Sequence, residues 1–422
     1  MSSSIDHQPP SRVDSPMAVP YIPLTFDNAN ADESARELAY ALNPSWKNTE
    51  GPVEVVRFTD GITNTLSKAT KRWPDRTESQ NDDDAILMRA YGKGTDVLID
   101  REREMKAHTL LASMDLAPPL LARFDNGLMY KFVQGDVCTP EDLRRPEVYR
   151  QTAKLLGQWH GSLPVSAITR TPDLDKDADQ KHCGMKNGKH TRPMPNIWSV
   201  MQSWINALPN GTAKERERNK MLDSELAVLS ARFGDTPGVD GKDYIFSHTD
   251  LLAGNVIMQK PSGTKISNGD NKERPVCFID YEYSTPGPAA FDISNHFAEW
   301  AGFECDHGAV PTKSQRRDFL KNYIGSFRVH AIDLEQTMSY EIDLQKDIDQ
   351  LYDQIDQFRG LPGFYWGIWA LIQATISQID FDYTTYAEDR LGEYFAWKAE
   401  EDGSRAKEGK EMPLRERRWA EE

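Results

Sequence analysis

The chain has 422 residues, enough for about two or three domains of ordinary size with a substantial buried core. Its 50 basic and 66 acidic residues give a formal net charge of −16, so the overall field repels nucleic acid and anionic membranes and favours a cationic partner. The four cysteines, Cys138, Cys183, Cys277 and Cys305, show neither a zinc-site spacing nor a disulfide framework, which predicts reduced thiols and a cytoplasmic protein.

Neither a targeting signal nor a membrane span is evident in the sequence. The first twenty residues are dominated by Ser, Pro and Asp, without the apolar run of a signal peptide, and predict a disordered leader over 1–22. The most apolar later run, 366–376, is shorter than the roughly 18–20 residues that cross a bilayer and contains Gln373. We therefore expect a soluble protein with no stable membrane insertion.

Residues 23–134 predict an N-terminal lobe built on a small antiparallel sheet with one helix. The pattern of β-branched runs and turn residues predicts a hairpin over 53–70, a third strand over 85–91, a helix over 100–111 that begins near Asp100, and two strands over 120–124 and 129–133. The order of these elements is β-β-β-α-β-β.

Residues 135–398 predict a larger, mainly helical C-terminal lobe. Apolar spacing predicts helices that start near 140 and cover 148–160, 198–208, 216–233 and most of 291–398, with short strands over 243–247, 256–259 and 276–279. Asp, Lys, Gly and Pro make 166–195 a surface insertion, and 399–422 a solvated, mixed-charge tail. The predicted fold class is α+β, in two lobes.

The residues that carry chemistry cluster between 247 and 300. His248, Asp250 and Asn255 follow the pattern H-x-D-x-x-x-x-N, and Asp280 ends a later strand, which is the spacing of a kinase catalytic loop. Phosphoryl transfer needs a carboxylate to accept the proton of the acceptor hydroxyl, for which we assign Asp250, and oxygen ligands for Mg²⁺, for which we assign Asn255 and Asp280. The alternative is that these side chains only cap a turn. His248 fits a structural anchor better than a catalyst.

Nucleotide-binding residues are predicted in the N-terminal lobe on weaker grounds. The hairpin tip TDGITN (59–64) offers backbone N–H groups at Gly61 and the side chains of Thr63 and Asn64 to phosphates, although no Walker or glycine-rich G-x-G-x-x-G motif is present and an ordinary turn explains it equally well. Arg89 stands where a kinase lysine grips phosphates, and Glu104 could hold it by an ion pair. A plain surface pair is the alternative.

Several segments together resemble the choline/ethanolamine kinase family. They are TDGITN (59–64), ILMRAYG (86–92), HTDLLAGNV (248–256), FIDYEY (278–283), FDISNHFAEW (291–300) and WGIWALIQA (366–374). The resemblance covers about 50–398 and implies a protein-kinase-like fold, with transfer of the ATP γ-phosphate to ethanolamine as the first step of phosphatidylethanolamine synthesis. TDGITN and the residues 299–303 look more like ethanolamine kinases than choline kinases. Dimers, which the family often forms, are implied as well.

The resemblance also implies roles for individual residues. Asp250 would be the base, Asn255 and Asp280 would hold Mg²⁺, and Arg89 with Glu104 would position ATP. Tyr130, Phe132 and Val133 would face the adenine, and the acceptor pocket, which Asp250 also adjoins, would comprise Glu299, Tyr283, Trp366, Trp369, Phe381 and Tyr386. An aromatic box with one carboxylate suits a small ammonium, by cation–π attraction and charge pairing. Packing of the two tryptophans in the core is the alternative.

Two departures from the family pattern concern the acceptor pocket. Thr249 stands where the family loop usually has Asn, and STPGPAA (284–290) is richer in proline than expected. The choice of amine therefore stays open, with a choline kinase as the alternative. An aminoglycoside-type phosphotransferase shares the H-x-D-x-x-x-x-N loop, but the WGIW and NHFAEW segments disfavour it. A catalytically silent kinase-like module that binds amine or nucleotide is disfavoured because the base and both metal ligands are present.

Overall fold

The computed structural model describes residues 19–58, 64–169, 192–259, 274–331, 343–377 and 379–422. The chain divides into two compact units that interleave along the sequence. Unit 1 comprises Met1–Tyr91 and Pro118–Phe132, and unit 2 comprises Gly92–Ala117 and Val133–Glu422. The sequence assigned 92–117 to the N-terminal lobe, whereas its contacts group it with unit 2.

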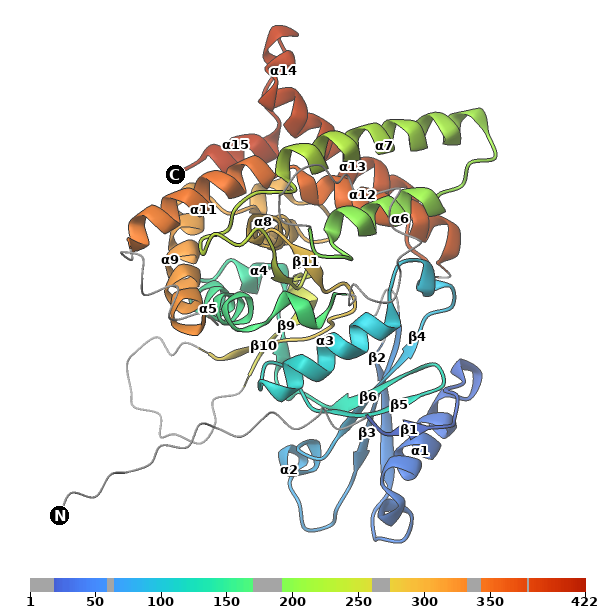
Figure 1. The fold of residues 1–422 in the computed structure, drawn as a ribbon. Helices are drawn as coiled ribbons and strands as arrows, with labels where there is room; N and C mark the ends of the chain where they lie inside the picture. The colour runs from blue at the N-terminus through green and yellow to red at the C-terminus, as the bar shows by residue number, and fades with distance from the viewer. Residues whose placement is uncertain (1–18, 59–63, 170–191, 260–273, 332–342, 378) are drawn as a thin grey trace, which may run out of the picture. The chain divides into compact units, whose positions relative to one another are not determined.

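Unit 1 is built on one six-stranded sheet, in which strand order is β1-β5-β6-β4-β3-β2 (Figure 1). The strands are β1 (Tyr21–Ile22), β2 (Val53–Phe58), β3 (Asn64–Lys71), β4 (Ile86–Tyr91), β5 (Leu120–Phe124) and β6 (Gly127–Lys131). Every pair is antiparallel except β1 with β5. The predicted strands are therefore confirmed, with β6 beginning two residues earlier than expected.

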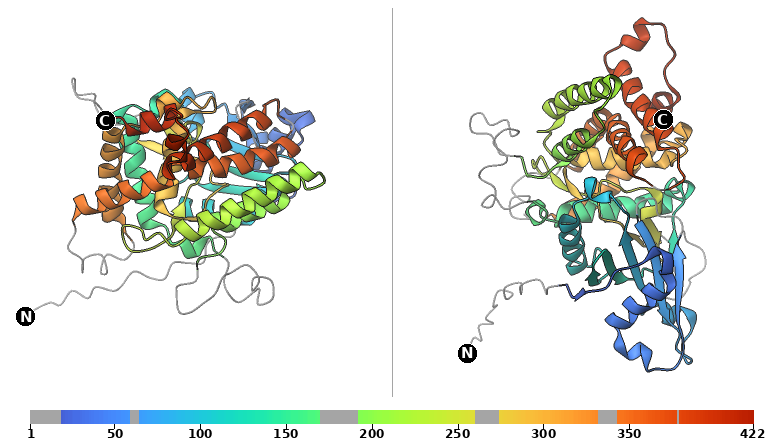
Figure 2. Two further views of the ribbon diagram at one scale, coloured as in Figure 1. Left: turned by 90° about the horizontal axis from the view of Figure 1, so that it is seen from above. Right: turned by 90° about the vertical axis from the view of Figure 1, so that its right-hand side faces the viewer.

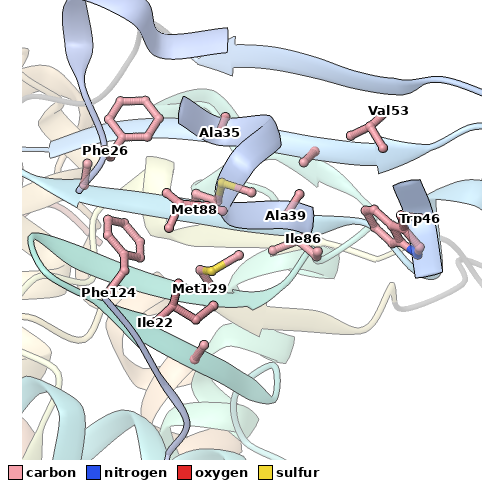
Figure 3. Close-up of a cluster of buried hydrophobic side chains, with 14 residues drawn as sticks. Ile22, Phe26, Ala35, Ala39, Trp46, Val53, Ile86, Met88, Phe124 and Met129 are labelled. Atoms are coloured by element: carbon pink, nitrogen blue, oxygen red, sulfur yellow. The ribbon is translucent and has the colours of Figure 1, made fainter. Parts of the chain in front are cut away.

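The core of unit 1 lies between this sheet and α1 (Ala31–Leu42), a helix that the sequence did not predict. Ala35 and Ala39 of α1 face Ile86 and Met88 of β4, with Met129 beside them (Figure 3). The small alanine side chains let the helix lie close to the strands, and each buried methyl or methylene group contributes roughly 0.8 kcal/mol. A short helix, α2 (Glu78–Asp82), lies in the polar stretch between β3 and β4.

The prediction of a disordered leader over 1–22 is wrong for its last residues. Residues 1–18 lie outside the described part of the chain, but Tyr21 and Ile22 form β1 and pair with Arg123 and Phe124 of β5. Ile22 belongs to the unit 1 core and is 8% exposed. The strand is only two residues long, too short for a periodic apolar pattern to reveal it.

Unit 2 is mainly helical, as expected. Its helices longer than one turn are α3 (Arg101–Ser113), α5 (Pro146–Ser162), α6 (Ile197–Ala207), α7 (Ala213–Phe233), α8 (Ala289–Ala298), α9 (Lys313–His330), α11 (Leu344–Phe358), α12 (Leu361–Ile376), α13 (Tyr383–Glu401) and α15 (Leu414–Ala420). Single turns form α4 (Pro140–Leu143) and α14 (Ser404–Lys407). The predicted start of α3 is confirmed, because the Asp100 side chain caps it by accepting from the Arg103 N–H at 3.0 Å.

Short strands of unit 2 carry the loops that matter for chemistry. One pair joins β8 (Ile245–Ser247) and β11 (Thr285–Gly287), and a three-stranded sheet has the order β10-β9-β7. Its members are β7 (Asp136–Val137), β9 (Val256–Met258) and β10 (Val276–Phe278). The predicted strands are confirmed here, whereas β11, in the proline-rich stretch noted above, was missed.

Helices α12 and α13 run side by side and pack closely along their length (Figure 2). Glycines on α12 permit this approach: a Cβ at Gly363 would lie 2.5 Å from the carbonyl oxygen of Arg390, and one at Gly367 would lie 2.7 Å from Leu391 Cγ. The helix that carries Trp366 and Trp369 is thereby fixed against the helix that carries Tyr386 and Arg390.

The C-terminal residues 399–422 are not a solvated tail, which corrects the sequence prediction. Trp419 of α15 is 4% exposed, and the buried guanidinium of Arg316 from α9 lies 3.9 Å from the centre of its indole ring. Arg316 also donates to the Trp419 carbonyl at 2.9 Å, and the Trp419 indole donates to Asp356 at 2.6 Å. The sequence pattern did not predict this helix, because the segment is rich in charged residues and Trp419 supplies most of its apolar contact.

Two further expectations concern segments only partly covered. Most of the predicted surface insertion, 170–191, lies outside the described residues, while Ile168 at its start is 3% exposed. Among the described residues, no helix is both long and apolar enough to cross a membrane.

Candidate active site

The predicted catalytic loop follows β8 and lies entirely within unit 2. His248 and Thr249 are fully buried, Asp250 is 6% exposed and Asn255 is 8% exposed. Asn255 closes the loop, because its side-chain amide donates to the Asp250 carbonyl oxygen at 2.7 Å and to the Asp250 carboxylate at 3.1 Å. The sequence spacing of Asp and Asn therefore produces direct contact between them.

A buried carboxylate that the sequence analysis did not single out holds this loop in shape. Asp292 of α8 accepts hydrogen bonds from the backbone N–H groups of His248 at 2.9 Å and of Thr249 at 2.7 Å. The His160 ring of α5 lies 2.9 Å from the same carboxylate. Burial acts to raise the pKa of Asp292, but these hydrogen bonds and the adjacent histidines lower it overall. A charged Asp292 thus supports the backbone of the loop.

His248 anchors the loop through both ring nitrogens, the role expected for it. Its Nε2 lies 3.1 Å from the Ile279 carbonyl oxygen, and its Nδ1 accepts from the backbone N–H of Asp250 at 3.3 Å. Burial lowers the pKa of His248 to about 4, so the ring is neutral at physiological pH. This protonation state suits Nε2–H as a donor to the carbonyl.

Four carboxylates converge on the position of the proposed base. The pKa of Asp250 is raised well above its ordinary value by burial and then by the negative charges of Asp280, Glu299 and Glu282. Glu282 is 1% exposed. A concentration of negative charge in a buried site favours the binding of cations, which lower the pKa of a neighbouring carboxyl when they bind.

The proposed ligands for Mg²⁺, Asn255 and Asp280, offer oxygen atoms, which this cation prefers. Among the described residues, no group of three His, Cys, Asp or Glu side chains is arranged to hold a metal ion. Two side-chain ligands are nevertheless what a nucleotide-bound Mg²⁺ uses, since phosphate oxygens and water fill its remaining positions. The donor set therefore fits Mg²⁺ held together with ATP.

Two residues of the site adopt left-handed backbone conformations that are unusual for residues other than glycine. Thr249 has φ +63° and Asp280 has φ +65°. Such conformations cost roughly 1–3 kcal/mol each and concentrate at functional sites. Thr249 is held by its hydroxyl, which lies 2.6 Å from the Tyr283 carbonyl oxygen. This contact shows how threonine fits where the family loop usually has asparagine.

An arginine missed from the sequence joins two buried glutamates. Arg101 of α3 donates to Glu104 at 3.0 Å and to Glu282 at 3.1 Å. Glu104 is 2% exposed, and its bond to Arg101 is an interaction that the sequence analysis did not consider. Its expected ion pair with Arg89 of β4 would join the two units and stays a prediction.

The aromatic residues expected around the amine form one connected wall. The Tyr283 and Trp366 rings are 5.7 Å apart, those of Trp366 and Trp369 are 5.4 Å apart, and the Trp369 indole donates to the Tyr283 hydroxyl at 2.8 Å. Phe381 and Tyr386 continue the series at 5.5 Å. Two members that the sequence analysis missed complete it, Tyr383 between Trp369 and Phe381, and Phe303 against Phe381 and Tyr386.

Glu299, the proposed ammonium-binding carboxylate, follows α8 and is 5% exposed. It accepts a hydrogen bond from Arg390 Nη2 at 3.3 Å, and Arg390 in turn lies 5.8 Å from the centre of the Tyr386 ring. Burial raises the pKa of Glu299, and Arg390 partly offsets this. The structure thus brings the carboxylate close to one end of the aromatic wall.

The remaining predicted residues lie mostly in unit 1. Gly61 and Thr63 are outside the described residues, and Asn64 begins β3. Tyr130 lies in β6; Phe132 follows that strand and stacks on Phe58 with ring centres 6.5 Å apart, while the Lys68 ammonium lies 4.1 Å from its ring centre. Val133 is the first residue of the second segment of unit 2. The adenine role of these residues stays a prediction.

Comparisons with known proteins show which family the chain matches. A family model described as choline/ethanolamine kinase matches residues 55–395. Ethanolamine kinase 1 of Mus musculus is 29% identical over 408 residues, covering 93% of this chain and 96% of its own, and ethanolamine kinase 2 of Homo sapiens is 30% identical, covering 90% and 84%.

Solved structures show the same fold. An ethanolamine kinase of Plasmodium vivax superposes with a TM-score of 0.62 at 24% identity, over 87% of this chain and 88% of its own. A choline kinase of Cryptosporidium parvum gives 0.59 at 20% identity, over 87% and 95%. The predicted α+β, protein-kinase-like fold class is confirmed.

Proposed function

Because the chain belongs to the choline/ethanolamine kinase family, we propose that it transfers the γ-phosphate of ATP to the hydroxyl group of ethanolamine. The observation that carries this proposal is the position of a buried carboxylate, Glu299, near an aromatic wall and near the proposed base, Asp250. A small cation that bears a hydroxyl group matches both features. Phosphoethanolamine would be the product, the first intermediate of phosphatidylethanolamine synthesis.

The proposed base acts on the acceptor hydroxyl. Asp250 would hold the hydroxyl by a hydrogen bond, orient its oxygen for in-line attack on the γ-phosphorus and accept its proton as the new P–O bond forms. Asn255 keeps this carboxylate in place through the contact at 3.1 Å. Asn255 and Asp280 would hold Mg²⁺, which neutralises phosphate charge when bound and so stabilises the transferring group.

Recognition of the amine rests on charge and aromatic faces. A primary ammonium can donate hydrogen bonds to the Glu299 carboxylate, which a quaternary ammonium cannot do. The rings of Trp366, Trp369 and Tyr386 supply cation–π attraction to either amine. This difference, together with the names of the curated relatives, supports ethanolamine over choline as the preferred substrate.

Turnover of purified protein tests the proposal directly. ATP consumption is measured with ethanolamine and with choline, each across a titration of Mg²⁺ and with EDTA as the control. We expect a higher kcat/KM for ethanolamine than for choline and loss of turnover in EDTA. Failure with both amines at saturating Mg²⁺ refutes the function, and a higher kcat/KM for choline reassigns the substrate.

Location and assembly belong to the same proposal. A cytoplasmic enzyme is supported by Cys138, Cys277 and Cys305, all free thiols in the described part of the chain. The family resemblance makes a homodimer the expected assembly. Cell fractionation and light scattering of the purified protein test these two points.

A further inference from the structure

The guanidinium of Arg390 lies between two buried glutamates. Its Nη2 is 3.3 Å from Glu299, and its Nε is 3.7 Å from the carboxylate of Glu393, one turn further along α13. Arg390 is 1% exposed, Glu299 5% and Glu393 7%. Three ionisable side chains are therefore withdrawn from water as one cluster, in which each charge depends on the others.

The charges of these three side chains do not balance. Two carboxylates and one guanidinium leave one negative charge, and isolated buried charge is strongly unfavourable. Glu393 has a further partner, because His307 Nε2 lies 2.8 Å from its other oxygen. Glu299 shares Arg390 with Glu393, which leaves negative charge in the cluster for the proposed ammonium to balance.

The two glutamates differ in how firmly they hold their charge. Burial acts to raise the pKa of Glu393, but Arg390 and the His307 contact lower it to about 2. The pKa of Glu299 is instead raised by burial, and Arg390 is the main influence that lowers it. Arg390 is thus the main group that lowers the pKa of both glutamates, and His307 adds a further favourable contact for Glu393.

Arg390 also fixes where the carboxylate lies. Glu299 begins a short 3-10 helix that ends at Ala301, and the next residue, Gly302, has a φ of +62° that suits glycine. Arg390 reaches Glu299 from α13, and α13 is packed against α12 through Gly363. The same contact thus sets the position of Glu299 relative to Trp366 and Trp369 on α12.

We propose that Arg390 is a positioning residue that keeps the Glu299 carboxylate ionised and directed toward the substrate ammonium, with Glu393 holding the guanidinium in place. This inference rests on the proposed function, since it assigns the amine to Glu299. Arg390 itself is not placed in contact with the reacting atoms.

Other groups act on Glu299 as well and must be considered in any pH experiment. Those whose electrostatic influence reaches it, or that influence its partners, are Asp250 from the catalytic loop, Cys305 after α8, Tyr386, Arg390 and Glu393 from α13, and His307 and Arg415 through Glu393. Arg390 and Arg415 are the permanent cations among them.

The test compares Arg390→Met, Arg390→Lys and a matched control, Arg218→Met. Arg218 also pairs with a glutamate of α13, Glu388, at 2.6 Å, but on a more exposed part of the helix. For Arg390→Met at neutral pH, we expect KM for ethanolamine to rise about tenfold to a hundredfold, while KM for ATP changes little. Arg390→Lys should show a smaller rise, and Arg218→Met none.

The pH profile separates this role from a merely structural one. Loss of Arg390 removes the main group that lowers the pKa of Glu299, so a larger share of this carboxyl should be protonated at a given pH than in the wild type. We therefore expect KM of Arg390→Met to fall as pH is raised, over a range in which the amine stays protonated and the wild-type KM changes little. A KM that shifts equally for both substrates, or shows no such pH recovery, overturns the proposal.

A second variant covers the case in which Arg390→Met does not fold. Glu393→Gln leaves Arg390 to neutralise Glu299 alone, so KM for ethanolamine should rise without recovery at high pH; an unchanged KM overturns the proposal.

The wild-type measurement separates failure of the proposed function from failure of the proposed role of Arg390. A wild-type protein without ethanolamine turnover refutes the proposed function, whereas an active wild type with an unaltered Arg390→Met variant refutes only the role of Arg390.

Discussion

The indole of Trp366 donates a hydrogen bond of 2.8 Å to the side-chain oxygen of Asn295. The amide nitrogen of Asn295 in turn donates to the carbonyl oxygen of Thr249 at 2.7 Å. A single buried side chain on α8 therefore joins the helix of the aromatic wall to the backbone next to the proposed base. The acceptor pocket and the catalytic loop are parts of one hydrogen-bonded structure.

Replacement of Asn295 should disturb both parts together. Asn295→Leu leaves the Trp366 N–H and the Thr249 carbonyl buried without these partners, at a cost of about 1–3 kcal/mol for each group. We expect a lower free energy of unfolding in urea and a lower kcat/KM for ethanolamine. Asn322→Leu on α9, a partly exposed position, is the control; equal effects of the two variants would contradict the bridging role.

Removal of the proposed base should abolish turnover without weakening the fold. Asp250→Asn eliminates proton acceptance, and we expect kcat to fall by about 10²–10⁴-fold. It also removes one of four mutually repelling carboxylates, so the melting temperature should stay the same or rise. Calorimetry and steady-state kinetics check both outcomes against Asp353→Asn, an exposed position on α11. Full turnover by Asp250→Asn would refute its assignment as the base.

Substitutions in the aromatic wall should change KM for the amine and leave KM for ATP unchanged. Trp369→Leu removes one ring face and the hydrogen bond to Tyr283, and a cation–π contact contributes about 0.5–2 kcal/mol. We expect KM for ethanolamine to rise by about 2- to 30-fold, with KM for ATP unchanged. Trp46→Leu, in the core of unit 1, serves as a comparison that tests for effects of lost stability alone. A larger change in KM for ATP than for ethanolamine would contradict the assignment.

The C-terminal helix should contribute to global stability. Trp419→Ala removes a buried indole, its bond to Asp356 and its stacking with Arg316, and we expect a loss of about 3–5 kcal/mol. Denaturation in urea measures this loss. Met412→Ala, at a side chain that is 45% exposed, should change stability by less than about 0.5 kcal/mol. A solvated tail would instead make the two variants equivalent.

Acid should destabilise the protein through the buried His296. Burial lowers its pKa to about 4 from an ordinary value near 6.5, so the unfolded chain binds the proton more readily. Its contribution is therefore fully present above pH 6.5 and is lost as pH falls through about 4, a change of about 3 kcal/mol. Unfolding measured between pH 7 and 4 should show a shallower dependence for His296→Gln than for wild type, with His330→Gln unchanged. Parallel curves would exclude this linkage.

The sequence predicts the catalytic loop well because its chemistry is local. His248, Asp250 and Asn255 follow one another within eight residues, and the contact between Asp250 and Asn255 forms within that loop. The strands and most of the longer helices are also evident from apolar periodicity. The aromatic residues were found through resemblance, and Trp366 and Trp369 do share one face of α12.

What escaped prediction depends on contacts between distant segments. Nothing near Arg101 indicates that it pairs with Glu282, and nothing near Glu299 points to Arg390. Asp292 was part of a recognised segment, but its role requires knowledge that α8 lies beside the catalytic loop. The short strand β1 is likewise stabilised by its pairing with β5, far away in the chain.

The interleaving of the two units has a consequence for the order of synthesis. Strand β4 leaves the ribosome before α3, whereas β5 and β6, which lie between it and β1 in the sheet, follow α3. The six-stranded sheet therefore cannot be completed until residue 131 has been made, by which time a helix of unit 2 is already present. The units alternate along the polypeptide, so a split protein would need three cuts, after residues 91, 117 and 132.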